Sequence, residues 1–120
     1  MFANPLRITP DETMRNAKNI MKEQGISGLP VVDKARLAGV LSLYDILKCY
    51  DDGSLDDKVS KYMSRDVILL EEDMPISFAI NYFNKYKYRR FPVINKNKEL
   101  TGMITARDLT SAMLKNISMQ

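Results

Sequence analysis

A hydroxyl and a carboxylate recur three residues apart at two places in this 120-residue chain, as Ser42 with Asp45 and as Thr105 with Asp108. An ionised carboxylate can accept hydrogen bonds from two neighbouring ribose hydroxyls, and the adjacent hydroxyl can add a third contact. The same spacing is that of a capping box, in which both side chains satisfy free N–H groups at the start of a helix. The spacing taken alone favours capping, and a binding role needs support from the surrounding residues.

Three arginines provide such support in the second half of the chain. Arg89 and Arg90 precede an apolar run, and Arg107 lies between Thr105 and Asp108. Guanidinium groups bind phosphate in a forked geometry, although an adjacent arginine pair can also be a solvated connection between two elements. Arg107 falls in the first turn of a predicted helix, where the helix dipole disfavours a cation, and this placement indicates an anion.

The two halves of the chain repeat each other at a separation of 62 residues. Pro30 aligns with Pro92 in this register, and a shift of one residue after Lys34 then aligns Gly39 with Gly102. Similar halves commonly pack about a pseudo-twofold axis and create two related clefts. We therefore expect one repeat over residues 1–62, including a linker helix at 55–62, and a second over residues 63–120.

The start of the chain takes part in this repeat. Met1 aligns with the internal Met63, so we expect the chain to be a piece of a longer protein, unless Met1 is simply the initiator.

Each half is predicted to run strand, helix, strand, strand, helix. Hydrophobic residues recur at helical spacing in four segments, and Gly25 is expected to end the first helix. The predicted core faces of these helices are Met14, Ala17, Ile20 and Met21; Leu43, Ile46, Leu47 and Tyr50; Ile76, Ala79, Ile80 and Phe83; and Leu109, Ala112 and Met113.

The composition excludes several classes of function. The chain has no histidine, so His-based catalytic triads and the common zinc sites are excluded. The single cysteine, Cys49, has no internal disulfide partner, which is typical of a reducing cytoplasm. No apolar run approaches the roughly 20 residues that span a bilayer. We expect a cytoplasmic, non-enzymatic chain without catalytic residues, a metal site or a membrane span.

Longer motifs in a fixed order carry a family resemblance. Gly-Ile-Ser-Gly-Leu-Pro-Val-Val-Asp occupies residues 25–33, Arg-Arg-Phe-Pro-Val-Ile-Asn occupies 89–95, and glycine, two apolar residues, Ser or Thr, two residues and Asp occur twice. Over essentially its whole length the chain resembles a tandem pair of CBS domains, also called a Bateman module. The resemblance implies an α/β (α+β) fold of two β-α-β-β-α units packed about a pseudo-twofold axis.

The resemblance also implies a function and partners. Such modules are regulatory and non-catalytic, and they sense adenosine-containing ligands such as AMP, ADP or ATP in the clefts between the two repeats. They commonly form homodimers and regulate an attached or partner effector domain such as an enzyme, transporter or channel. An adenine nucleotide would then be a regulatory ligand of this chain, which needs no other cofactor.

The resemblance assigns residues to two clefts. In the main cleft Thr105 and Asp108 would hold a ribose and the three arginines would meet phosphates. The second cleft has Ser27 and Gly28 where the main cleft has the arginine pair, so we expect weaker phosphate binding there. The main cleft would comprise Ala3, Pro5, Leu6, Ile26, Ser27, Gly28, Arg89, Arg90, Thr105, Arg107 and Asp108, and the second Ser42, Tyr44, Asp45, Val67, Ile68 and Tyr88.

Two other functions remain open at this point. In the first, the chain is a structural dimerisation module whose hydroxyl–Asp pairs only cap helices. In the second, the basic stretch at 85–90, where Tyr86 and Tyr88 interleave with cations, binds single-stranded nucleic acid. The net charge of only +3 makes nucleic acid the less favoured partner.

Overall fold

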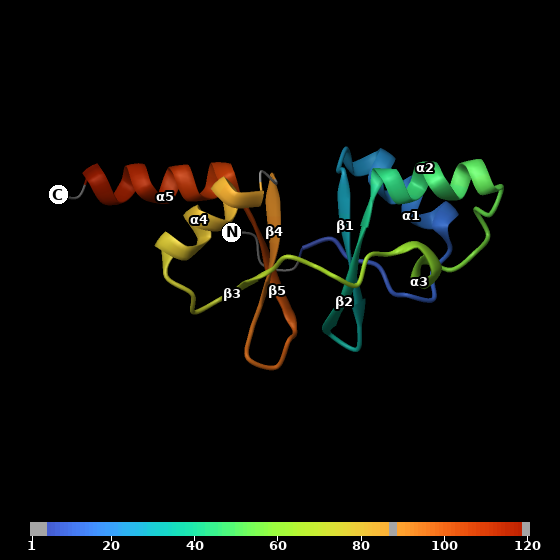
Figure 1. Ribbon diagram of the computed structural model, residues 1–120, viewed down its shortest axis with the longest axis horizontal. Coiled ribbons are helices and arrows are strands. Elements are labelled where there is room, and N and C mark those ends of the chain that lie inside the picture. The colour runs from blue at the N-terminus through green and yellow to red at the C-terminus, as the bar shows by residue number, and fades with distance from the viewer. Residues whose placement is uncertain (1–4, 87–88, 119–120) are drawn as a thin grey trace. The chain divides into compact units, whose positions relative to one another are not determined.

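The computed structural model describes residues 5–86 and 89–118, and these form two compact units (Figure 1). One unit is Leu6–Val67, and the other runs from Ile68 onward and includes Pro5. The division falls after Val67 because Ser64 and Val40 exchange two backbone hydrogen bonds, of 2.9 and 3.0 Å, which hold the segment after residue 62 on the first unit. The repeat boundary at residue 62 concerns the duplication of sequence and stays a prediction.

The first unit is an antiparallel hairpin covered by helices. Its sheet is extended on one side by Ile8, which pairs in parallel with Val31, and on the other by Ser64. The elements in chain order are α1 (Met14–Gln24), β1 (Gly28–Asp33), β2 (Arg36–Ser42), α2 (Leu43–Asp52) and α3 (Val59–Tyr62).

The second unit has the same topology with a fully formed third strand. Strand β3 pairs in parallel with β4, and β4 pairs antiparallel with β5, giving the order β3-β4-β5. The elements are β3 (Leu70–Glu71), α4 (Ile76–Tyr86), β4 (Arg90–Ile94), β5 (Leu100–Thr105) and α5 (Ala106–Ser118).

The strand registers confirm that the two units are repeats. Gly28 pairs with Ser42 in the first unit, and Arg90 pairs with Thr105 at the matching place in the second. Both hairpins carry a register shift at the same point, after Val31 in β1 and after Val93 in β4. The duplication seen in the sequence is therefore a duplication of hydrogen-bonding pattern.

The one-residue offset between the repeats lies in the hairpin turns. The first turn has Lys34 and Ala35 at positive φ, 50° and 72°, as a tight two-residue hairpin turn requires. The second turn is one residue longer, and its Asn95 side chain accepts hydrogen bonds from the backbone N–H groups of Asn97 and Glu99. The two turns are therefore stabilised differently, the first by two residues at positive φ and the second by hydrogen bonds to the Asn95 side chain.

Replacing Ala35 by glycine should stabilise the protein. A residue with a Cβ pays about 1 kcal/mol in the left-handed region, and glycine does not. We expect Ala35→Gly to raise the free energy of unfolding by about 0.5–1 kcal/mol in urea denaturation. Ala38→Gly, in the extended strand β2, is the matched control and should lower that free energy. Equal changes in the two variants would contradict this view of the turn.

Glycine at position 39 permits close contact between β2 and the following segment. A Cβ at Gly39 would lie 2.5 Å from the backbone oxygen of Ser64 and 3.2 Å from the sulfur of Met63. Because a backbone atom cannot move aside cheaply, Gly39→Ala should lower the free energy of unfolding by about 2 kcal/mol. Gly28→Ala is the control, since its Cβ would find nothing nearer than 3.9 Å. Thermal and urea unfolding of both variants would measure the difference.

The helix ends agree with prediction except at α3. Thr13 caps α1, and Gly25 ends it with φ of 62°. The linker helix was expected from residue 55 but begins at Val59. Its expected first turn is not helical because its carbonyls serve α1 instead, accepting hydrogen bonds from the N–H groups of Met14 and Arg15.

Each unit has its own hydrophobic core, and the core of the first unit contains more buried residues. The buried residues are Ile8, Met14, Ala17, Met21, Leu29, Val31, Leu41, Ile46, Cys49, Val59 and Met63 in the first, and Leu70, Ala79, Phe91, Val93 and Leu109 in the second.

Three predicted core faces differ from the structure. On α2 the residues Leu43, Leu47 and Tyr50 are exposed, because the helix turns Ile46 and Cys49 toward the core. On α4 Ile76 is 43% exposed, and on α5 Met113 is 40% exposed.

Candidate functional site

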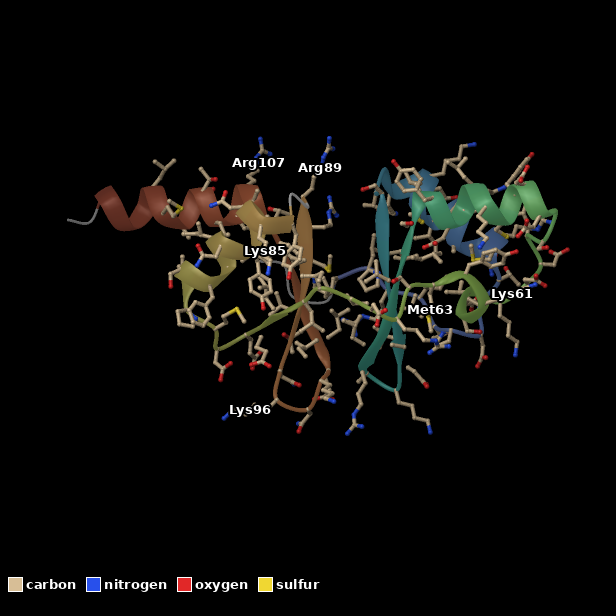
Figure 2. All side chains as sticks on the ribbon, viewed as in Figure 1. Lys61, Met63, Lys85, Arg89, Lys96 and Arg107 are labelled. Carbon is tan, nitrogen blue, oxygen red and sulfur yellow. The ribbon has the colours of Figure 1, made fainter. Side chains whose placement is uncertain are left out.

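The second unit brings the arginine pair beside the Thr105–Asp108 pair. Arg90 lies directly opposite Thr105 on the β4–β5 ladder, and the backbone N–H of Ala106 donates to the carbonyl of Arg89 at 3.3 Å. Figure 2 shows the side chains of Arg89 and Arg107 extending from the same end of this unit. The start of β4, the end of β5 and the first turn of α5 therefore form one site.

Both hydroxyl–carboxylate pairs form capping boxes. The Thr105 N–H donates to the Asp108 carboxylate at 2.9 Å, and the Asp108 N–H donates to the Thr105 hydroxyl at 3.0 Å. In the first unit, Ser42 and Asp45 make the same pair of bonds at 2.8 and 3.3 Å, and the serine hydroxyl also donates to the carboxylate at 3.1 Å. These hydrogen bonds hold each carboxylate in one position beside the end of a strand. A ligand-binding group needs such a fixed position.

The ionisation state of Asp108 suits a hydrogen-bond acceptor. Partial burial would raise the pKa of Asp108, but hydrogen bonds from the backbone and side chain of Thr105 are among the interactions that outweigh it, and the net pKa is below its usual value near 3.8. The group is therefore ionised at neutral pH and offers only acceptor oxygens, which is what a pair of hydroxyl groups requires.

The lowered pKa of Asp108 makes stability depend on acid pH. The folded protein favours the ionised form of Asp108 more strongly than the unfolded protein does. The full stabilisation that Asp108 gives to the folded protein is therefore present above about pH 5. As the pH falls below 3.8 and through the lower folded pKa, that stabilisation is lost. The difference in unfolding free energy between the wild type and Asp108→Asn should thus be constant from pH 5 to 7 and shrink between pH 4 and 2. A difference that grows on acidification would contradict this assignment.

The two arginines of the pair lie in different environments. Arg89 is exposed, whereas Arg90 is half-buried, and its Nε is buried with no hydrogen-bond partner among the described residues. A buried donor without an acceptor is costly, so an anion that reached Nε would recover free energy. Arg107 is exposed in the first turn of α5.

The first unit has the same backbone arrangement without the cations. Gly28 lies opposite Ser42, and the N–H of Leu43 donates to the carbonyl of Ser27 at 3.2 Å. Ile26 packs against the first core, and Tyr44 is 82% exposed.

The remaining predicted residues are divided between the units. Leu6 is exposed and belongs to the first unit, as Val67 does, whereas Pro5 and Ile68 belong to the second. Ala3 and Tyr88 lie outside the described residues. Each predicted cleft combines residues of both units, so the joining of these residues into clefts stays a prediction.

The family model for the CBS domain matches residues 1–52 and residues 59–115. The chain belongs to the CBS domain family. Because the two matched segments correspond to the two repeats, it is a tandem CBS pair, as the sequence motifs indicated.

Relatives of this CBS pair include longer proteins. It is 38% identical over 102 residues to the uncharacterized protein MJ1232 of Methanocaldococcus jannaschii, covering 85% of this chain and 34% of that protein. It is 32% identical over 114 residues to a 17.7 kDa protein of Acidianus ambivalens, covering 94% and 70%. Against inosine-5'-monophosphate dehydrogenase of Aquifex aeolicus the identity is 33% over 111 residues, covering 91% and 22%.

Solved structures confirm the fold of the CBS pair. CBSX2 in complex with AMP matches with a TM-score of 0.81 and 24% identity, covering 93% of this chain and 89% of that one. The CBS domain pair of protein MJ0100 in complex with 5'-methylthioadenosine and S-adenosyl-L-methionine matches with a TM-score of 0.72 and 24% identity, covering 95% and 93%. The predicted α+β class is therefore confirmed.

Several other features of the CBS pair bear on its function. Within the described residues, no cluster of His, Cys, Asp or Glu could hold a metal ion, and no helix has the length and apolar character to cross a membrane. Burial raises the pKa of the Cys49 thiol, which disfavours a nucleophilic role. The Tyr86 ring packs edge-on against Tyr82 and Phe91, at 5.7 and 6.4 Å between ring centroids, so it serves packing and not base stacking.

A cavity in the first unit was missed by the sequence reasoning. It has a volume of about 750 Å³ and lies between α1 and the β1–β2 turn. Its polar lining includes Glu12, which lies just before α1, and Asn16, Asn19 and Glu23, which fall on one side of α1 at helical spacing. That polar face was the available signal, although a polar helix face is usually only solvated.

Proposed function

We propose that this CBS pair is a regulatory module that binds an adenosine-containing ligand and performs no catalytic step itself. The observation that carries the proposal is the buried Nε of Arg90, on the strand position opposite Thr105, which has no hydrogen-bond partner among the described residues. Solved CBS pairs of the same fold hold AMP in one case and 5'-methylthioadenosine with S-adenosyl-L-methionine in another. These ligands share an adenosine group.

The ribose lies against the Thr105–Asp108 cap. The ionised Asp108 carboxylate accepts hydrogen bonds from the 2'- and 3'-hydroxyls, and the Thr105 hydroxyl contributes a further bond. The N-terminus of α5 adds a favourable field for the phosphate. Arg90, the first residue of β4, and Arg89, just before it, approach that phosphate from one side, and Arg107 approaches it from α5.

The base occupies the part of the cleft contributed by the other repeat. Ile26 and Gly28 offer an apolar and a small residue on which a flat ring can lie, and Ser27 is adjacent. The Ala3–Leu6 segment faces the base from the opposite side. The second cleft uses Ser42 and Asp45 for a ribose in the same way, with Tyr44, Val67, Ile68 and Tyr88 around the base.

Regulation follows if the ligand favours one arrangement of the two repeats over another. An attached or partner effector domain would read that arrangement, and a homodimer of CBS pairs would transmit it between chains. We place this module in the cytoplasm, where adenine nucleotides are available as signals.

Calorimetric titration of the chain with AMP, ATP and S-adenosyl-L-methionine tests the proposal. We expect saturable binding of at least one ligand, with the affinity reduced at least tenfold by Asp108→Ala. Asp45→Ala removes the matching cap of the other repeat and should leave the affinity for the phosphate-bearing ligands nearly unchanged. The absence of heat with every adenosine compound would overturn the proposal.

The capping boxes favour a second candidate, a structural module without a ligand. Asp108→Ala should destabilise the unliganded protein by about 1 kcal/mol under either function, because a cap is lost. The two functions differ in the wild type, where only a ligand-binding module should show a melting temperature that rises with nucleotide concentration. Differential scanning calorimetry with and without AMP separates them.

A further inference from the structure

The first unit shows how the N-terminus of its opening helix is covered. The segment before α3 crosses the start of α1, where the N–H groups of Met14 and Arg15 donate to the carbonyls of Asp57 and Leu55 at 2.9 and 2.8 Å. Val59 is fully buried in the core, and Leu55 packs against it. This short segment thus supplies two apolar side chains four residues apart and two backbone acceptors.

The matching place on the second unit lacks such a cover among the described residues. Ile76 and Ser77 are the counterparts of Met14 and Arg15, and their N–H groups have no partner in the part of the chain that the structure describes. Ile76 is 43% exposed, whereas Met14 is fully buried.

An apolar cavity opens at the same place. Its volume is about 160 Å³, and its lining includes Leu70, Met74, Ile76 and Ala79. In the first unit the counterparts of Leu70, Ile76 and Ala79 are core residues packed in one cluster with Val59. The cavity is therefore suited to an apolar side chain with the role of Val59.

The charge around this cavity differs from that of the first unit. Glu71 and Glu72 line it and Asp73 follows, whereas the matching residues 9–12 of the first unit carry two acids, Asp11 and Glu12, and are followed by Arg15 where the second unit has Ser77. Asp11 pairs with Lys58 of the covering segment at 3.5 Å. The second unit thus has three acids and no matching arginine, where the first has two acids and Arg15, and this more negative charge favours a more basic partner.

We propose that the surface formed by Glu71, Glu72, Met74 and Ile76, here the α4 entry face, docks a protein segment. That segment has two apolar side chains four residues apart with basic residues between them. Its apolar side chains fill the cavity and cover Ile76, its carbonyls accept from the N–H groups of Ile76 and Ser77, and its cations meet the acidic rim. The proposal does not depend on nucleotide binding.

A synthetic peptide of residues 53–63 carrying Asp56→Lys and Asp57→Lys is the probe. Both replacements suit this face, because the acidic rim favours cations and the partner of Asp56 in the first unit, Arg15, is matched here by Ser77. In fluorescence anisotropy with the full chain, we expect saturable binding at least tenfold tighter than that of the unmodified peptide. Further replacement of Leu55 and Val59 by serine in the probe should abolish binding.

Variants of the protein locate the binding site. Ile76→Asp should weaken binding of the probe at least tenfold, whereas Leu114→Asp, at an exposed apolar residue on α5, should change it less than twofold. Circular dichroism checks that both variants fold, and Met74→Ser, at another residue that lines the cavity, is the second variant if Ile76→Asp does not fold. Asp108→Ala should leave peptide binding unchanged, which separates this proposal from the nucleotide site.

Three results would overturn the proposal. The first is the absence of saturable binding up to about 1 mM probe. The second is equal binding of the probe and its serine version, which would show that charge alone drives association. The third is a dimer in sedimentation analysis that Ile76→Asp dissociates and the probe does not, because a second copy would then occupy the face.

Discussion

Replacing Arg89 and Arg90 together by alanine should weaken AMP binding about 100-fold and leave adenosine binding within about threefold of the wild type. A hydrogen bond to a charged group contributes about 1.5–3 kcal/mol, so two of them account for a factor of this size. Arg90 should account for more of the loss than Arg89, because its half-buried guanidinium is less screened by water. Calorimetry with AMP and adenosine on the single and double variants would measure each share.

The control for this experiment is a cation at the other end of the same unit. Lys96 lies in the β4–β5 turn, away from Arg89 and Arg107 (Figure 2). Lys96→Ala should leave AMP affinity unchanged at 0.15 M salt, where distant charges are screened. If the arginine variants weaken the binding of adenosine and of AMP by the same factor, the arginines do not bind the phosphate.

Phe91→Ala should cost about 3–5 kcal/mol of unfolding free energy, the largest effect of a single substitution that we expect in this chain. Phe91 is fully buried in β4, and its ring meets those of Phe83, Tyr82 and Tyr86 edge-on, with centroids 4.7, 6.2 and 6.4 Å away. Truncation would remove its own burial and leave three aromatic rings around a cavity. Urea denaturation followed by tyrosine fluorescence and circular dichroism would measure the loss.

The comparison for this prediction is an aromatic residue of the same unit that is not buried. Phe78 is 52% exposed on α4, and Phe78→Ala should cost less than about 1 kcal/mol. If the two substitutions cost the same, the aromatic cluster around Phe91 does not stabilise this unit.

The features of the fold that could be predicted from sequence are those that depend on short stretches of neighbouring residues. The apolar stretches on either side of Pro30 and Pro92 form paired strands, and the shift of one residue in the alignment appears as a longer turn after Ile94. The spacing of Thr105 and Asp108 predicted a helix start, and both residues cap α5. Register and caps depend on a few neighbouring residues, so sequence spacing was sufficient.

Features that depend on tertiary packing were not predictable in this way. On α2, the stripe of Leu43, Leu47 and Tyr50 and the pair Ile46 and Cys49 both fit helical spacing, and only contact with the sheet decides which face is buried. The late start of α3 depends on hydrogen bonds to α1, more than forty residues earlier in the chain. The exposure of Ile76 depends on what covers α4, which periodicity within α4 does not encode.

The candidate site was predictable to the level of one repeat. Arg90 and Thr105 are fifteen residues apart in sequence, and the hairpin register places them opposite each other. The proposed contribution of Ser27 and Gly28 to the same cleft depends on how one repeat meets the other, which is a matter of surface complementarity and not of local pattern.

A crystal structure of the full chain with bound AMP tests the central claim most directly. We predict that the ribose hydroxyls lie within hydrogen-bond distance of the Asp108 carboxylate and that the phosphate lies against Arg90. AMP bound with its ribose away from Asp108, or with its phosphate away from all three arginines, would contradict the account.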